Sequence, residues 1–209
     1  SADGKTVWDA DMSGGITWLS NANLAATETF GVSGIAANGM MDWHVAQNWI
    51  AAMNTSNYLG YHDWRLPSVT DTGTPGCTYP PTSSSDCGYN ITSSEMGHLY
   101  YIELGNYPFF NDAYHPKSGL IDDPAIPNDE SLFTNFQSSY YWSGTEYAPN
   151  TEAAWMFQFD AGDQGFNYSK FSNLYALVVR SGDVATVPRS HHGMATRFRP
   201  TRLNRSGAA

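Results

Sequence analysis

The sequence is poor in charged residues, has only two cysteines and contains no long hydrophobic run. Lysine, arginine, aspartate and glutamate together make up 14 % of the 209 residues, against about a quarter in ordinary globular proteins. Apolar residues reach 41 % and aromatic residues 14 %, so the chain can fill a core and is not of the disordered class. Its length suits a single domain. A surface of neutral polar groups is typical of extracellular proteins.

Basic residues are the scarcer of the two charged classes. The chain has 10 lysines and arginines against 20 aspartates and glutamates, which gives a net charge of −10. The basic run is the tail from Arg189 to Arg205, so the body, residues 1–188, is more acidic than the whole. Nucleic acids require a basic footprint, and we therefore expect no nucleic-acid partner. An acidic body suits a divalent cation or simple solubility and disfavours anionic ligands away from the tail.

The missing hydrophobic run excludes a transmembrane segment, because about 20 consecutive apolar residues are needed to cross a bilayer. The sequence begins at Ser1 and continues directly into polar residues, as the processed form of an exported protein would. We therefore expect an extracellular or cell-surface protein. We also expect one domain over residues 1–188, followed by a polar basic tail over residues 189–209.

The two cysteines, Cys77 and Cys87, lie in a loop rich in proline, serine and threonine. A zinc site would need more ligands nearby, and a redox pair would usually be Cys-x-x-Cys beside a helix. A structural disulfide that closes the loop fits the spacing best, and it implies an oxidising compartment.

Short aromatic and β-branched runs between residues 138 and 180 predict antiparallel strands that form one small core sheet. Trp155, Phe157 and Phe159 alternate with less bulky residues, which predicts one strongly apolar face. The cluster at residues 161–165 is expected to be the turn of a hairpin that continues into residues 166–168. In the last run, residues 175–180, alternate side chains are expected to face opposite ways.

Two further strands are expected at residues 6–9 and 16–19, on either side of a glycine-containing turn. Asp42 predicts the start of a helix that continues through Asn54 and has an apolar face at helical spacing. Residues 92–95 match a capping box, which predicts a second helix ending at Gly105. Helices near the middle, strands at both ends and long irregular loops indicate an α+β fold.

Several side chains are candidates for ligand contact. Trp142 and Trp155 lie in predicted strands and could stack on the apolar face of a sugar ring, although strand aromatics usually belong to the core. Glu146 and Tyr147 follow a strand and are expected in a loop, which makes them better candidates. For a calcium ion, the candidate ligands are acidic pairs, although Asx turns explain the same residues. These pairs are Asp122 with Asp123 and Asp160 with Asp163.

The sequence contains the run Asp-Trp-Arg-Leu-Pro at residues 63–67. Further short motifs stand at residues 15–19, 95–100, 133–138, 141–148, 154–157 and 179–184. Together the motifs span about residues 5–188. In this order they resemble a bacterial domain family, DUF1566, which is the type found at the C-terminus of the Legionella collagen-like adhesin. Trp64, Arg65 and Arg180 lie within these motifs, and we interpret them as structural.

The resemblance implies a C-type-lectin-like fold, in which two helices pack on a small twisted antiparallel sheet and long loops present the binding face. It also implies an exported, non-enzymatic surface or matrix protein that binds a polysaccharide or surface glycan. The alternative is a structural subunit that self-associates into an extracellular filament or sheath through contacts of its termini with neighbouring subunits, which the low charge and neutral polar surface also fit. Neither hypothesis requires a cofactor beyond a possible Ca²⁺.

Overall fold

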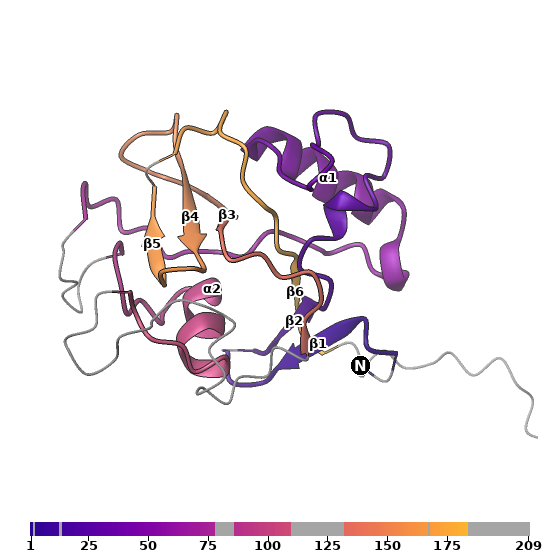
Figure 1. Cartoon of the computed structure of the whole chain (residues 1–209), viewed down its shortest axis with the longest axis horizontal. Helices are drawn as coiled ribbons and strands as arrows, with labels where there is room; N and C mark the ends of the chain where they lie inside the picture. Colours follow the sequence, from indigo (N-terminus) through magenta and orange to yellow (C-terminus); the bar gives the residue numbers. More distant parts are fainter. Residues whose placement is uncertain (2, 13, 78–85, 110–131, 167, 184–209) are drawn as a thin grey trace, which may run out of the picture.

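The computed structural model describes residues 1, 3–12, 14–77, 86–109, 132–166 and 168–183. Within these ranges the chain has the expected α+β class, with two α-helices and two three-stranded antiparallel sheets (Figure 1). The first sheet has the order β1 (Thr6–Asp9), β2 (Ile16–Leu19), β6 (Val179–Ser181). The second has the order β3 (Tyr140–Glu146), β4 (Ala154–Gln158), β5 (Asp163–Gly165). The helices are α1 (Trp43–Thr55) and α2 (Glu95–His98), with single helical turns η1 (Leu24–Ala26), η2 (Tyr58–Gly60) and η3 (Leu99–Glu103).

The prediction of one core sheet is wrong, because its last strand belongs to a different sheet from the others. β6 pairs with β2, a strand near the start of the chain, with Thr17 opposite Arg180. Just before β6, Leu174 pairs with Met41 and Tyr175 pairs with Tyr141 of β3. The extended segment 174–181 therefore runs from one sheet to the other and joins them into a single unit.

This central segment also divides the core into two halves. Tyr175, Leu177 and Val179 pack in one hydrophobic cluster, with α2, η3 and Phe157 of β4. Ala176 and Val178 pack in the other, with α1. The alternation expected for residues 175–180 is confirmed, and its physical reason is the two-residue period of an extended chain.

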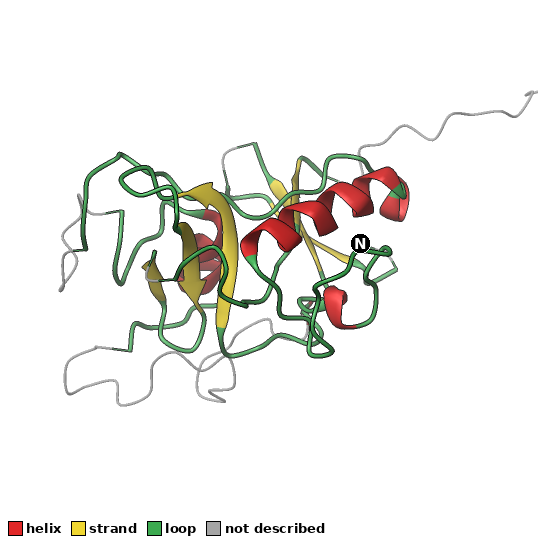
Figure 2. Ribbon diagram, turned by 90° about the horizontal axis from the view of Figure 1, so that it is seen from above, coloured by secondary structure: helices red, strands yellow, loops and turns green. Residues whose placement is uncertain are grey.

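Helix α1 follows its prediction closely. The carboxylate of Asp42 accepts a hydrogen bond from the backbone N–H of Val45 at 2.8 Å, which caps the helix. The buried side chains are those expected from the helical period, namely Ala46, Trp49, Ile50 and Met53. Figure 2 shows the start of this helix beside β3, where the Trp43 indole donates to the Ser143 carbonyl oxygen at 2.8 Å.

The second helix forms where expected, but the predicted capping box is wrong. Ser94 is the N-cap and accepts a hydrogen bond from the N–H of Gly97. Glu95 is then the first helical residue. Its carboxylate does not cap the helix but accepts two hydrogen bonds from Arg65. An ion pair with two parallel hydrogen bonds is stronger than a neutral cap. After His98 the chain widens into η3, a single π-helical turn.

The turn of the β4–β5 hairpin is also displaced from its predicted position. Asp163 to Gly165 form strand β5 rather than the turn, and the reversal lies at residues 159–162. The other edge of β5 is occupied as well, because Gln164 forms a bridge with Gly88. Pairing on both sides explains why polar residues with a turn-like composition are extended here.

Candidate functional site

A cavity opens at the end of the β3–β4 hairpin. It has a volume of about 350 Å³ and is lined by aromatic and polar side chains from two loops. The first loop joins β3 to β4 and the second follows β5. These loops are held together by a bridge between Ala153 and Ser169 and by a hydrogen bond from the Lys170 N–H to the Glu152 carbonyl oxygen at 3.0 Å. The lining residues are Tyr147, Asn150, Glu152, Ala153, Phe166, Tyr168 and Ser169.

The back wall of this cavity is a rigid pair of aromatic rings. Tyr147 stacks on Phe166 with ring centroids 3.6 Å apart and an angle of 5° between the planes. The edge of Trp155 packs against both rings. Edge-to-face contacts such as those of Trp155 add about 0.5–1.5 kcal/mol each to area burial. These contacts restrain the orientation of the Tyr147 and Phe166 rings.

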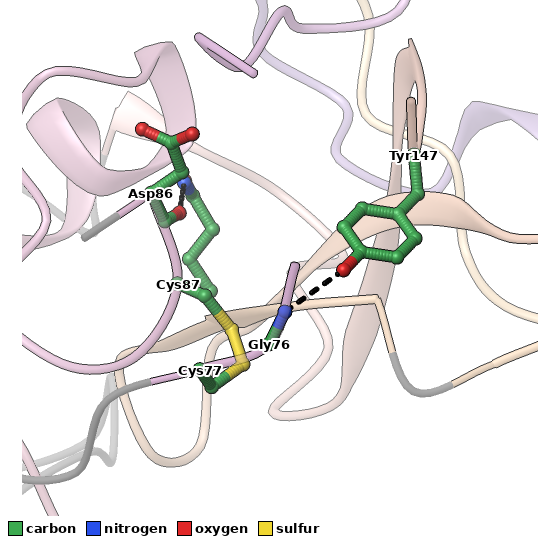
Figure 3. Close-up of a disulfide and its surroundings, with 6 residues drawn as sticks. Gly76, Cys77, Asp86, Cys87 and Tyr147 are labelled. Atoms are coloured by element: carbon green, nitrogen blue, oxygen red, sulfur yellow. Dashed lines mark hydrogen bonds between the residues drawn. A yellow bond between two sulfur atoms is a disulfide. The ribbon is translucent and has the colours of Figure 1, made fainter. Parts of the chain in front are cut away.

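The disulfide supports the wall from behind. Cys77 and Cys87 are bonded as predicted, with their Cα atoms 5.0 Å apart. Both cysteines pack against the small hydrophobic cluster that contains Tyr147 and Trp155. The hydroxyl of Tyr147 accepts a hydrogen bond at 3.0 Å from the N–H of Gly76, the residue before Cys77 (Figure 3). The bridge thus fixes the loop that holds the tyrosine in place.

Asp71 is the polar anchor of the same wall. Its carboxylate accepts hydrogen bonds from the Trp155 indole at 2.8 Å and from the backbone N–H groups of Ala148 and Gly73 at 2.7 Å. Burial raises the pKa of this carboxyl, but the three donors outweigh burial and leave the pKa below its ordinary value. Asp71 is therefore a charged acceptor that connects three separate segments.

The rim of the cavity is polar and exposed. Asn150, Glu152 and Ser169 are all exposed, and the Asn150 side-chain oxygen accepts a hydrogen bond from the Glu152 N–H at 3.2 Å. Tyr168 is half-buried and packs edge-on against Tyr140 at 5.0 Å. Burial and the hydrogen bond between these two tyrosines raise the pKa of Tyr140 to about 12. The Tyr140 phenol thus stays neutral at physiological pH.

Of the residues predicted to contact a ligand, Tyr147 lines this cavity, whereas the two tryptophans lie in the core. Trp142 is fully buried and its indole donates to the Met41 carbonyl oxygen at 3.0 Å. Trp155 is 1 % exposed, so neither indole presents a face to solvent. Glu146 is exposed beside the cavity and forms an ion pair with Lys170, whose ammonium lies 4.5 Å above the Trp43 ring.

The sequence analysis missed Asn150, Glu152, Phe166, Tyr168 and Ser169. These residues lie in two loops that are separated along the chain by strands β4 and β5, and tertiary contacts such as the bridge between Ala153 and Ser169 bring them together. One local signal was available, because both loops combine an aromatic residue with asparagine, serine or threonine near a strand end.

Two of the four predicted calcium ligands, Asp160 and Asp163, fall within the described residues. Asp122 and Asp123 lie outside the described residues, as does the tail at 189–209. Asp160 follows β4, and Asp163 is buried at the start of β5. Among the described residues, the group of three clustered carboxylate and imidazole side chains is a different one, formed by Asp9, His98 and Glu103.

The residues interpreted as structural are held in ion pairs and hydrogen bonds. Arg65 binds Glu95 through two hydrogen bonds of 2.7 and 2.6 Å. Arg180 binds Asp63 at 2.8 and 3.0 Å and lies 4.1 Å above the Tyr61 ring. The Arg180 hydrogen bonds lower the pKa of Asp63. Trp64 is 2 % exposed, and its indole donates to the Tyr58 carbonyl oxygen at 3.0 Å.

Comparison with known proteins identifies a family but no individual relative. A family described as the Lcl C-terminal domain matches residues 6–180, which run from the first strand of the fold into the last. No curated protein matches the chain, and no solved structure matches it. None of the described helices has the length and apolar character needed to cross a bilayer.

Proposed function

The chain belongs to the Lcl C-terminal domain family, and on this basis we propose that it is a non-enzymatic, surface-exposed recognition domain whose cavity beside Tyr147 binds a neutral glycan. The family is of an adhesin type, and the disulfide suits an oxidising, extracellular location. We extend the proposal to the arrangement of a C-type-lectin-like fold, in which long loops carry the binding face. The cavity lies between two such loops.

The observation that carries this proposal is the chemistry of the cavity lining. Binding sites for small molecules combine an apolar or aromatic wall with a few convergent polar groups. Here the apolar part comes from Phe166 and Tyr168, and the polar part comes from Asn150, Glu152 and Ser169. A pyranose has the same two characters, an apolar face and a girdle of hydroxyl groups. A volume of about 350 Å³ is sufficient for one or two sugar rings.

Charge decides which glycans are favoured. Five of the ten basic residues lie between Arg189 and Arg205 and no acidic residue does, so residues 1–188 carry a net charge of −15. Glu152 adds a carboxylate to the rim of the cavity itself. A sulfated or uronic-acid polymer would be repelled by this body. The proposal therefore specifies neutral polysaccharides.

A glycan array followed by calorimetry tests the proposal. We expect the full chain to bind neutral oligosaccharides in preference to sulfated ones. Tyr168→Ala should weaken binding of the best array hit by about tenfold or more, because it removes a stacking surface worth about 1–3 kcal/mol by analogy with ring stacking on aromatics. The matched control is Tyr107→Ala, since Tyr107 is 41 % exposed and does not line the cavity. Equal loss in both variants, or no bound polysaccharide at all, would refute the proposal.

Self-association is the second candidate function, and the observation that favours it is the position of β1. This strand is at the edge of its sheet, and its Trp8 is 38 % exposed. An edge strand offers unpaired backbone groups to a second copy of the chain. We expect a concentration-dependent dimer or larger species in light scattering that Trp8→Lys abolishes. A monomer at millimolar concentration would exclude this candidate.

A further inference from the structure

We propose that Asp9, His98 and Glu103 form a binding site for one divalent transition-metal ion, with zinc as the preferred ion. The three residues are remote from the glycan cavity in sequence, and none of them lines it. They come from two parts of the fold that are far apart in the chain. Asp9 is the last residue of β1, His98 is the last residue of α2, and Glu103 is the last residue of η3.

The π-helical turn is what places His98 and Glu103 on one side. Residues five apart on an ordinary α-helix are rotated by about 140° from each other and point to different faces. In η3 the turn is wider, and the backbone N–H of Leu104 bonds to the carbonyl oxygen of Leu99 at 2.9 Å, five residues earlier. As a result, His98 Nε2 lies 3.2 Å from Glu103 Oε1. Single π turns inside helices are often found at functional sites.

The spacing of the ligand atoms fits a small metal ion. His98 Nε2 lies 3.8 Å from Asp9 Oδ1, and the three ligand atoms all lie within 4.8 Å of one another. Around a tetrahedral zinc ion with bonds of about 2.1 Å, ligand atoms are about 3.4 Å apart. The two distances to the imidazole lie on either side of this value, so modest side-chain rotations suffice to bring the atoms into place.

A buried oxygen without a partner points independently to a cation. Asp9 is 3 % exposed, and its Oδ1 accepts hydrogen bonds from the backbone N–H groups of Asp11 and Met12. Its Oδ2 is buried and has no hydrogen-bond partner among the described residues. An unpaired carboxylate oxygen in such a position is costly. A metal ion held by both oxygens of the Asp9 carboxylate would remove the cost.

The cavity beside the cluster and the nearby carboxylate charges also favour a bound cation. Asp9 and Glu103 line a cavity of about 170 Å³ together with Trp18, whose buried indole N–H has no acceptor in the described part of the chain and is a donor for a water molecule there. The cavity has room for a water molecule as a fourth ligand. Burial raises the pKa of Glu103, and the charges of Asp9 and Asp11 raise it further, whereas His98 lowers it. A cation would relieve the repulsion between these carboxylates.

The ligand set decides between metals. Calcium takes six to eight oxygen ligands and magnesium keeps several waters around one or two carboxylates. One imidazole with two carboxylates is a set that zinc accepts, and three protein ligands plus an open position is a common zinc arrangement. The bound ion would link the end of β1 to the end of the second helix, so its expected effect is to stabilise the fold.

The test is zinc binding to the full chain after removal of metals with EDTA. The sequence also contains adjacent histidines at His191 and His192, so the experiment uses the His191→Ala/His192→Ala double variant as its background. In calorimetry with ZnCl₂ we expect one site per chain and a rise in melting temperature. CaCl₂ should give at least tenfold weaker binding.

Two variants locate the site. Glu103 has a side chain that is 34 % exposed, so Glu103→Gln should fold, and it should weaken zinc binding at least tenfold. His98→Ala should remove the single imidazole from the X-ray absorption spectrum of the zinc-loaded chain. The matched control, Glu28→Gln, changes an exposed carboxylate outside the cluster and should leave zinc affinity unchanged. Absence of zinc binding in the background chain, tighter binding of calcium, or full zinc affinity in Glu103→Gln would overturn the proposal.

Discussion

At the scale of single residues, a small number of charged side chains have structural roles that the low overall charge makes conspicuous. Arg65 connects the second helix to the central segment, because its guanidinium binds Glu95 while its backbone pairs with Val179. Asp71 connects the disulfide loop to the β3–β4 hairpin. In both cases one charged side chain connects segments that are distant in the chain.

We expect Arg65→Met to destabilise the fold by roughly 2–4 kcal/mol, because it leaves the Glu95 carboxylate, whose side chain is 8 % exposed, without its cation. The estimate is at the lower end for buried pairs, since the Arg65 side chain is 35 % exposed and solvent screens the pair. Arg65→Lys should recover part of this loss, because it keeps the charge but not the two parallel hydrogen bonds. Urea unfolding measures both, and unchanged stability in Arg65→Met would contradict this role.

Asp71→Asn should destabilise the protein by roughly 1–3 kcal/mol at neutral pH. An amide cannot accept hydrogen bonds on both sides, so either the Gly73 N–H or the Ala148 and Trp155 donors lose their acceptor. The pKa of Asp71 is lowered in the folded state. The contribution of its charge is therefore present above the unfolded pKa of about 3.9 and is lost as the pH falls through the lower folded value.

Urea unfolding of both proteins at pH 7, 5 and 3 checks this prediction. The difference in unfolding free energy between wild type and Asp71→Asn should be greatest at pH 7 and should shrink at pH 3. A difference that is constant over this range would show that the charge of Asp71 has no part in its role.

At the scale of elements, local patterns predicted the helices and the N-terminal hairpin better than the sheets. The strands at residues 6–9 and 16–19 were predictable because a glycine turn separates two β-rich runs that pair with each other. Helix α1 was predictable because its apolar face repeats at helical spacing. The pairing of Thr17 with Arg180 has no local signal, since any strand with an apolar face could take that place.

Local sequence patterns did not predict either candidate site, and the reason is the same for both. Tyr147 was identified from its position after a strand, but its partner Phe166 is recognised only once the loops are folded together. Likewise, His98 and Glu103 are five residues apart, a spacing that an α-helical pattern assigns to different faces. The π turn changes this spacing and places both side chains on one side.

Loss of the disulfide should have a limited, defined effect on stability. The bridge joins residues with a sequence separation of 10, and closing a loop of this size is worth roughly 2–3 kcal/mol in the chain-entropy model. The Cys77→Ser/Cys87→Ser variant should therefore melt at a lower temperature than wild type. Dithiothreitol should lower the melting temperature of wild type towards that of the variant and leave the variant itself unchanged; the same response in both proteins would contradict the assignment.

The start of the second helix depends on a glycine without a side chain. A Cβ atom on Gly97 would lie 1.9 Å from the backbone carbonyl oxygen of Ile91 and 2.8 Å from Ser94 Oγ. We expect Gly97→Ala to cost about 3 kcal/mol or more, because a backbone clash cannot be relieved by side-chain rotation. Gly144→Ala is the comparison, since its Cβ would meet Leu66 at the milder distance of 3.3 Å. Equal thermal stability of the two variants would count against the close approach at Gly97.

At the scale of the whole molecule, the central segment stabilises the main core and the disulfide stabilises the smaller core beside the cavity. Segment 174–181 joins both sheets and both halves of the main core. The cluster around Cys87 is a separate, smaller core that supports the cavity wall. A surface loop can therefore present rigid aromatic rings, although most of its neighbours are irregular. This is the property that a glycan-binding surface requires, because an ordered site has less conformational entropy to lose on binding.

The most direct test is an NMR titration of the full chain with the strongest neutral oligosaccharide from the array. We predict that amide shifts change in the two loops that enclose the cavity, at residues 147–153 and at Phe166, Tyr168 and Ser169. Tyr168→Ala should remove these changes, while Tyr107→Ala should retain them. Shift changes confined to other surfaces, or a spectrum that no neutral oligosaccharide alters, would contradict the account.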